Sequence, residues 1–121
     1  MEFTELSNKV IGCAIEVHKA LGPGLLESAY KECFCFELMA NSISIETEKA
    51  LPVTYKGVAL DCGYRMDVVV EGKMIIELKS VAKLEAIHDA QILSYMKLSG
   101  IKQGLLINFN SVLLKDGLKS F

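Results

Sequence analysis

The sequence predicts a mixed α/β fold whose elements follow the order α-α-β-β-β-α-β. Three observations indicate this fold. Apolar residues recur at three- and four-residue steps in the first third of the chain, they alternate with polar residues in the middle third, and a helical pattern at 84–99 separates strand patterns at 74–80 and 105–109. A helix between two strands predicts a right-handed crossover that joins parallel strands. The two strands before it are joined by a short turn, so that pair is expected to be antiparallel and the sheet mixed.

Two helices are expected first. The apolar stripe of the first helix comprises Leu6, Val10, Cys13, Ala14, Val17 and Leu21. The segment Gly22-Pro23-Gly24 ends this helix and opens the next. The second helix is expected over about 25–40 and is apolar on two sides. Its main stripe, the side that we expect to be buried, comprises Leu25, Ala29, Cys33, Phe36 and Ala40.

Strands follow in the middle of the chain. Alternating residues predict strands over 43–55, 58–70 and 74–80, with turns at Lys56-Gly57 and at 71–73. The helix over 84–99 has a stripe that comprises Leu84, Ile87, Gln91, Tyr95 and Leu98. A last strand is expected at 105–109, and the pattern of 112–121 predicts neither a helix nor a strand.

Composition limits the class of protein. The 121 residues include 13 Lys and Arg against 15 Asp and Glu, for a net charge of −2, and 51% are apolar. These values predict a single folded domain over 1–121 and exclude intrinsic disorder. The longest apolar runs are strand-sized, so we expect no membrane span, and the acidic start of the chain lacks the apolar segment of a secretory signal. The charge balance argues against coating nucleic acid by bulk charge and leaves a local binding site open.

The four cysteines are Cys13, Cys33, Cys35 and Cys62. None of them forms a CxxC pair, so a structural zinc site is not expected. Buried or surface thiols that stay reduced are typical of a cytoplasmic protein, and this is the location we expect.

Two carboxylates are expected to meet in the hairpin. If residues 71–73 form a three-residue loop, Val70 pairs with Met74, and the same register places Asp67 directly opposite Glu77. Their Cβ atoms would then lie ~5 Å apart on one face. Two carboxylates at that separation repel each other unless a proton or a cation lies between them.

The surroundings of this pair allow two interpretations. Arg65 and Lys79 lie on the same face, so the pair could belong to an exposed hairpin face that these cations neutralise. The flanking strand residues are, however, apolar on both faces, which is typical of a covered central strand. In such strands, two acids and a lysine indicate a functional site.

Two helices carry further polar residues at apolar positions. Glu27 lies beside Phe34 and Leu38, with Tyr30 at the edge of that side. It is either a first-turn acid that complements the helix dipole or a group directed at a site. Gln91 lies in the middle of an apolar stripe, where it either bonds to backbone or reaches a polar site on the sheet.

These residues resemble a known family. Asp67 followed by Glu77-Leu78-Lys79 resembles the PD-(D/E)XK nuclease superfamily, and Gly24-Leu25-Leu26-Glu27-Ser28-Ala29-Tyr30 resembles the GxxExxY protein family, a small branch of it. Similar text continues over nearly the whole chain, in Val17-His18-Lys19, Tyr64-Arg65-Met66-Asp67, His88-Asp89-Ala90-Gln91 and Gly104-Leu105-Leu106-Ile107-Asn108-Phe109. The resemblance implies a restriction-endonuclease-like fold, a mixed β-sheet flanked by helices.

The resemblance also implies a metal site. Asp67 and Glu77 would bind Mg²⁺ or Mn²⁺, the backbone carbonyl of Leu78 would be a third ligand, and Glu27 would act at the metal directly or through water. Oxygen donors of this kind are those that Mg²⁺ prefers.

The same resemblance implies roles for the remaining residues. Lys79 would position or deprotonate the attacking water or stabilise charge on phosphorus, and Gln91 would orient Lys79, water or a phosphate oxygen. The catalytic set would therefore be Glu27, Asp67, Glu77, Lys79 and Gln91, supported by Tyr30, Arg65 and Tyr95.

The function expected from these residues is metal-dependent hydrolysis of phosphodiester bonds in DNA or RNA. The alternative is a non-catalytic module that retains the nuclease fold and binds nucleic acid or a protein. A chain this small offers little surface for gripping a duplex, so a homo-oligomer or a protein partner is a further expectation.

Overall fold

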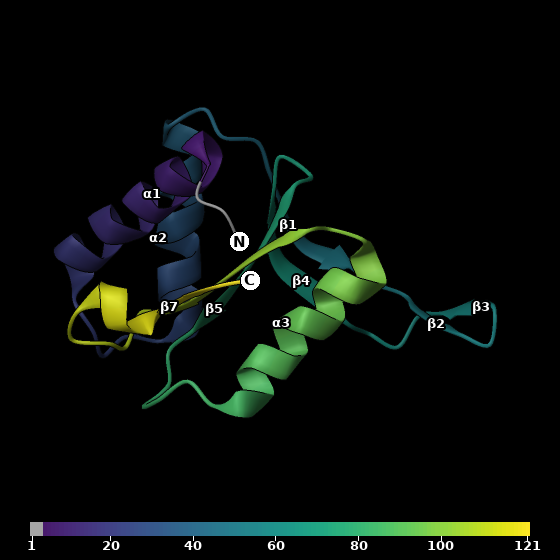
Figure 1. The fold of residues 1–121 in the computed structure, drawn as a ribbon. Helices are drawn as coiled ribbons and strands as arrows, with labels where there is room; N and C mark the ends of the chain where they lie inside the picture. The colour runs from purple at the N-terminus through teal and green to yellow at the C-terminus, as the bar shows by residue number, and fades with distance from the viewer. Residues whose placement is uncertain (1–3) are drawn as a thin grey trace.

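The computed structural model describes residues 4–121 and confirms a mixed α/β architecture (Figure 1). Its elements are, in chain order, α1 Glu5–Leu21, α2 Glu27–Ala40, β1 Ile45–Ala50, β2 Val53–Tyr55, β3 Val58–Leu60, β4 Arg65–Val70, β5 Met74–Lys79, α3 Ala86–Ser99, β6 Gln103–Asn108, the 3-10 helix η1 Leu114–Gly117 and β7 Leu118–Ser120. Among these described residues, no helix is long and apolar enough to cross a membrane.

Five strands form the main sheet in the order β1-β4-β5-β6-β7. Strands β5 and β6, which flank α3, are parallel, and the other neighbouring pairs are antiparallel. The predicted mixed sheet is therefore confirmed. The segment 112–121, which the sequence left open, supplies η1 and the edge strand β7.

The prediction of three strands before α3 was too simple, because the first two are each interrupted. Pro52 has no backbone N–H to donate and follows the end of β1. On the return, Gly63 adopts a left-handed φ of 81° and donates its N–H to the Asp61 carboxylate at 2.9 Å. The residues between these breaks form β2 and β3, a separate two-stranded hairpin that projects from the body of the molecule (Figure 1).

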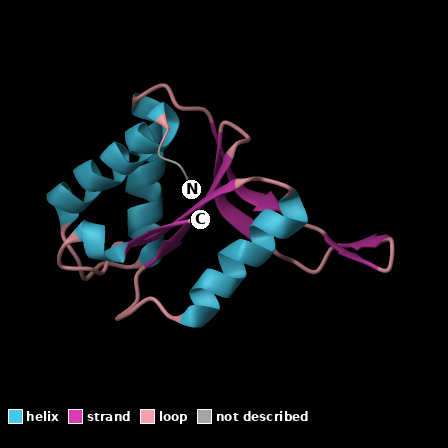
Figure 2. Cartoon of the chain, viewed as in Figure 1, coloured by secondary structure: helices cyan, strands magenta, loops and turns pink. Residues whose placement is uncertain are grey.

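Helices cover both faces of the sheet (Figure 2). One face packs with α1 and α2 around the buried residues Val10, Ala14, Tyr30, Phe34, Leu38, Val68, Val70, Ile76, Leu78, Ile107 and Phe109. The other face packs with α3 through Val69, Ile75 and Tyr95. Central strands covered on both sides need apolar side chains on both sides, which explains the continuous apolar runs in β4 and β5.

The buried side of α2 is not the one that we predicted. Tyr30, Phe34 and Leu38 are fully buried, and Phe109, directly after β6, lies stacked on Tyr30 with the ring centroids 4.8 Å apart. Phe36, from the predicted stripe, is 68% exposed. Both sides of α2 are apolar. The side that packs against the sheet is the one whose two aromatic rings, Tyr30 and Phe34, contact Phe109.

The predicted stripe of α3 was also partly wrong. Ile92 and Tyr95 are buried, while Ile87 and Leu98 are exposed. Gln91 lies at the edge of the buried side and is half-buried. Its side chain bonds to Tyr95, the buried residue one turn further along the helix.

Candidate metal and catalytic site

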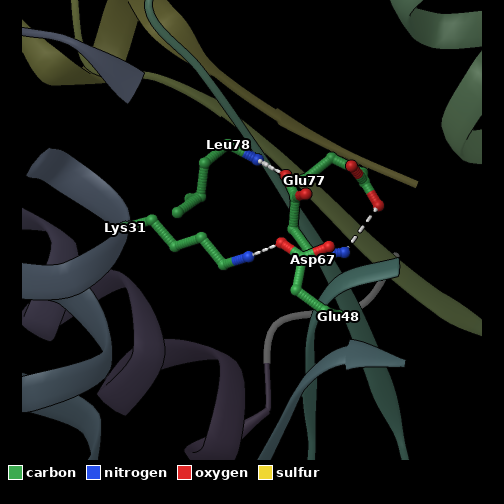
Figure 3. Close-up of polar contacts among 5 residues, drawn as sticks. All are labelled: Lys31, Glu48, Asp67, Glu77 and Leu78. Atoms are coloured by element: carbon green, nitrogen blue, oxygen red, sulfur yellow. Dashed lines mark hydrogen bonds and ion pairs between the residues drawn. The ribbon is translucent and has the colours of Figure 1, made fainter. Parts of the chain in front are cut away.

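Asp67 and Glu77 meet where the β4–β5 hairpin opens. The antiparallel pairs Val70–Met74, Val69–Ile75 and Val68–Ile76 confirm the predicted register. Beyond the last pair, backbone N–H groups donate to carboxylate side chains and not to backbone carbonyls of the facing strand. The Asp67 N–H donates to Glu77 Oε1 at 3.3 Å, and the Leu78 N–H donates to Asp67 Oδ2 at 3.0 Å (Figure 3). Each carboxylate thus accepts a hydrogen bond from the backbone of the strand that carries the other carboxylate.

The other neighbour of Asp67 also departs from regular pairing. The register of β1 with β4 pairs Thr47 with Val68 and Lys49 with Met66 and passes over the position between them. Glu48 occupies that position on β1 with a left-handed φ of 49°. A non-glycine residue at such a φ is strained, and strain of this kind is concentrated at functional sites.

The Leu78 backbone faces the same opening. The Lys79 carbonyl accepts a bond from the Phe109 N–H at 3.0 Å, so the backbone of Lys79 points toward β6. Successive residues of a strand point their backbone groups to alternate sides, so both the N–H and the carbonyl of Leu78 point toward β4. The carbonyl predicted as a metal ligand therefore lies on the side of the Asp67 carboxylate.

Burial and charge act strongly on Glu77. Its side chain is buried, and this desolvation, reinforced by the negative charge of Asp67 and a hydrogen bond with it, raises the pKa of Glu77 to about 8. The bond from the Asp67 N–H and the charge of Lys79 act in the opposite direction. A buried carboxylate with this raised pKa is stabilised either by binding a proton or by a cation beside it.

Glu27 belongs to the same electrostatic environment. Partial burial raises its pKa first, and the charge of Asp67 raises it further, whereas Lys79 and Lys31 lower it. Glu27 is the first residue of α2, and the charges of both hairpin strands act on it. The charges of Asp67 and Lys79 therefore both act on the Glu27 carboxylate at the start of α2.

A network of three hydrogen bonds positions the start of α2. The Tyr30 hydroxyl donates to the Gly22 carbonyl at 2.5 Å and accepts from the Leu25 N–H at 3.1 Å. Ser80, directly after β5, donates its hydroxyl to the Leu25 carbonyl at 2.5 Å. The predicted supporting residue Tyr30 thus fixes the turn that presents Glu27, and Ser80 ties that turn to the strand that carries Glu77.

Gln91 and Tyr95 approach from the opposite face of the sheet. We predicted Glu27 and Gln91 as members of one catalytic set, but α2 and α3 cover different faces of the sheet. Gln91 Nε2 donates to the Tyr95 hydroxyl at 3.2 Å. The pKa of Tyr95 is raised first by burial and then by the charges of Glu77 and Asp67, against the Gln91 hydrogen bond. The carboxylate pair therefore lies between the two helices.

Arg65 is directed away from this cluster. Its Nη1 atom contacts the Tyr64 carbonyl at 2.8 Å and the Asp61 carboxylate at 3.5 Å, at the base of the projecting hairpin. The alternative of a surface pair neutralised by Arg65 loses support, because this arginine is exposed and engaged elsewhere.

A family model described as the PD-(D/E)XK nuclease superfamily matches residues 4–121. The chain belongs to this superfamily. The match also confirms the expected restriction-endonuclease-like fold. Searches of curated proteins and of solved structures found no match. The narrower assignment to the GxxExxY branch stays a prediction.

The donor set suits the divalent metal that nucleases of this superfamily use. Asp67, Glu77 and the Leu78 carbonyl offer oxygen donors at the opening of the hairpin, and a cation would offset the burial and the repulsion from Asp67 that raise the pKa of Glu77. Within residues 4–121, no group of three or more His, Cys, Asp and Glu side chains is arranged as a metal cage. Mg²⁺ commonly binds through one or two carboxylates and keeps several waters, so two carboxylates with a carbonyl fit it.

Sequence reasoning missed two polar residues that lie around this candidate site. Lys31, one turn after Glu27, forms an ion pair with Glu48 across the groove that Asp67 borders (Figure 3). The spacing of four residues from Glu27 was the available signal. Asn108, buried at the end of β6, bonds both the N–H and the carbonyl of Val81, at 3.1 and 2.9 Å, and so holds the loop after Lys79. The signal for Asn108 in the sequence was a polar residue at the end of an otherwise apolar strand.

Proposed function

We propose that this chain works as a single nuclease-like domain that hydrolyses phosphodiester bonds of nucleic acid with Mg²⁺ or Mn²⁺. One observation carries the proposal: Asp67 and Glu77 oppose each other where the hairpin opens, with Lys79 on the same strand as Glu77. Adjacent carboxylates with a lysine beside them suit a metal-assisted attack on a phosphate.

The roles follow from the positions of the residues. Asp67, Glu77 and the Leu78 carbonyl would hold the metal, with Glu27 adding a carboxylate from α2. A divalent cation bound there supplies a water of lowered pKa and polarises the phosphate. Lys79 would orient that water or offset charge on the phosphate, as a catalytic residue. Gln91 would orient the phosphate or water from α3.

Positioning residues complete the proposal. Tyr95 bonds Gln91, and Tyr30 holds the turn before Glu27, so both act through another side chain. Arg65 stays a predicted supporting residue, although its contacts in this structure are with the Tyr64 carbonyl and Asp61. All four cysteines are free thiols, which supports the proposed cytoplasmic location.

Cleavage by purified protein tests the proposal. Labelled DNA and RNA, single-stranded and duplex, are incubated with Mg²⁺, and the Asp67→Asn and Lys79→Met variants are compared with wild type. We expect each variant to lose activity by roughly 100-fold or more. The exposed Lys102→Met is the matched lysine control, and circular dichroism confirms that each variant is folded.

Two outcomes would contradict the proposal. Cleavage that both variants retain would come from a contaminant or another site. Nucleic-acid binding by wild type without cleavage at any metal concentration would support the non-catalytic module.

A further inference from the structure

The groove between α2 and β1 has two chemically different ends. It encloses about 610 Å³, and we call it the α2–β1 groove. Its lining residues are Glu27, Ser28, Lys31, Glu32, Cys35, Phe36, Met39, Thr47, Glu48 and Asp67. One end holds Lys31 with Glu27 and Asp67, two of the proposed metal-binding acids, and the other is formed by the apolar side chains of Cys35, Phe36 and Met39. The apolar end is therefore continuous with the proposed catalytic site.

The exposed side of α2 builds the apolar end. Phe36 is 68% and Met39 59% exposed, although both lie on a helix whose other side is fully buried. Single exposed apolar residues are common on proteins. Here an aromatic ring and a thioether are neighbours at the mouth of one groove, and Phe36 lies five residues beyond Lys31, roughly 7–8 Å along the helix axis.

These two ends match the two halves of a nucleotide. A phosphate is anionic and suits a site with a lysine and a metal-binding carboxylate pair, whereas a base is a flat aromatic surface that stacks on phenylalanine. Lys31 lies at the acidic end, and in its ion pair the Glu48 side chain is 58% exposed and the Lys31 side chain 20% exposed. Because Glu48 is open to water, it holds this pair weakly, and Lys31 can exchange Glu48 for a phosphate.

We propose that Phe36 is a stacking platform for an unpaired base of the substrate and that Lys31 binds a phosphate of the same strand. The proposal rests on the proposed function and names its substrate class. Bases within a duplex are already stacked on both faces, so only a single-stranded or frayed segment can offer a base to Phe36. The preferred substrate is therefore a single strand, or a strand end, that lies along the α2–β1 groove.

Binding measured without cleavage tests this proposal. Fluorescence anisotropy follows a labelled single-stranded DNA and the matching duplex, with Ca²⁺ in place of Mg²⁺. Stacking on one aromatic side chain predicts that Phe36→Ala weakens single-strand binding by roughly 5- to 150-fold, while Phe36→Trp retains it. Duplex binding should change little in either variant. Leu93→Ala, which truncates a 50% exposed side chain on α3, is the control and should bind as wild type does.

A spectroscopic readout separates stacking from a structural effect. A single strand that carries 2-aminopurine should lose fluorescence when its base stacks on Phe36, and this quenching should be absent in Phe36→Ala and present in Phe36→Trp. Lys31→Met should weaken single-strand binding and flatten its salt dependence, because one phosphate contact is lost.

Several results would overturn the platform. One is that wild type fails to bind the single strand, and another is that Phe36→Ala loses single-strand and duplex binding equally. A change of sedimenting mass in Phe36→Ala would show instead that Phe36 belongs to a protein–protein interface. Unchanged single-strand binding in Phe36→Ala, while Asp67→Asn abolishes cleavage, would refute the platform and leave the proposed function intact. Absent cleavage with Phe36-dependent single-strand binding would refute the activity and leave the platform standing.

Discussion

Replacing Glu77 with Gln should make the metal-free protein more stable at alkaline pH. Gln has nearly the same shape and its carbonyl oxygen can still accept the Asp67 N–H bond, so the substitution removes chiefly the charge. In wild type, burial first, and then the charge of Asp67 and a hydrogen bond with it, raise the pKa of Glu77 from 4.5 to about 8. The folded state therefore binds more protons than the unfolded state between these two values.

The sign and size of the effect follow from this difference. Because the folded state holds the extra proton, the free energy of unfolding falls as pH rises from 4.5 and levels off above about 8. At about 1.4 kcal/mol for each pH unit between the two pKa values, the ceiling is on the order of 5 kcal/mol. Relaxation around the ionised pair lowers this, so we expect a loss of a few kcal/mol.

Urea denaturation in EDTA at pH 5, 6, 7 and 8 measures the effect. Wild type should lose stability across this range and Glu77→Gln should lose much less. Glu46→Gln, which removes an exposed acid of β1 paired with Lys49, should follow the wild-type profile. Adding Mg²⁺ at pH 8 should restore the free energy of unfolding of wild type and leave that of Glu77→Gln nearly unchanged. Parallel pH profiles for wild type and Glu77→Gln would refute the reasoning.

Three further substitutions test the supports of the site by urea denaturation. Tyr30→Phe leaves the Gly22 carbonyl and the Leu25 N–H without their partner, so it should cost about 1–3 kcal/mol and also weaken Mg²⁺ binding by calorimetry; a fully stable variant would contradict the network. Asn108→Ala leaves the Val81 N–H without its partner, while the Val81 carbonyl keeps the bond from Asn110 Nδ2 at 3.2 Å, and should cost about 1–3 kcal/mol; a loss below about 0.5 kcal/mol would show that water replaces the amide. Gly117→Ala drives a Cβ into the Asn108 carbonyl and should cost about 1–3 kcal/mol; unchanged stability would show that the backbone moves freely there.

The hairpin register could be predicted from the sequence because it follows from counting. A three-residue loop and strict alternation leave one pairing for Val70 and Met74, and that pairing places Asp67 opposite Glu77. The β-α-β unit was equally accessible, since a helix between two apolar strands predicts parallel pairing. These features depend on residues that are near each other in the sequence.

The choice between the two apolar sides of α2 could not be predicted in this way. Periodicity identifies both sides, but the buried one is decided by Phe109, which lies more than seventy residues away and stacks on Tyr30. The Lys31–Glu48 ion pair could not be predicted for the same reason. It joins a helix to a strand whose regular pairing with β4 is interrupted at Glu48. Periodicity within one element carries no information about such long-range partners.

Calorimetric titration of the metal-free protein with Mn²⁺ at pH 7 tests the central claim most directly. The claim is that Asp67 and Glu77 form a cation site in which a metal replaces the proton of Glu77. We predict one binding event in wild type that releases a proton, seen as a heat that changes between buffers of different ionisation enthalpy. Asp67→Asn should abolish binding, and Glu77→Gln should weaken it and remove the proton release. Equal Mn²⁺ affinity and equal buffer dependence in all three proteins would contradict the claim.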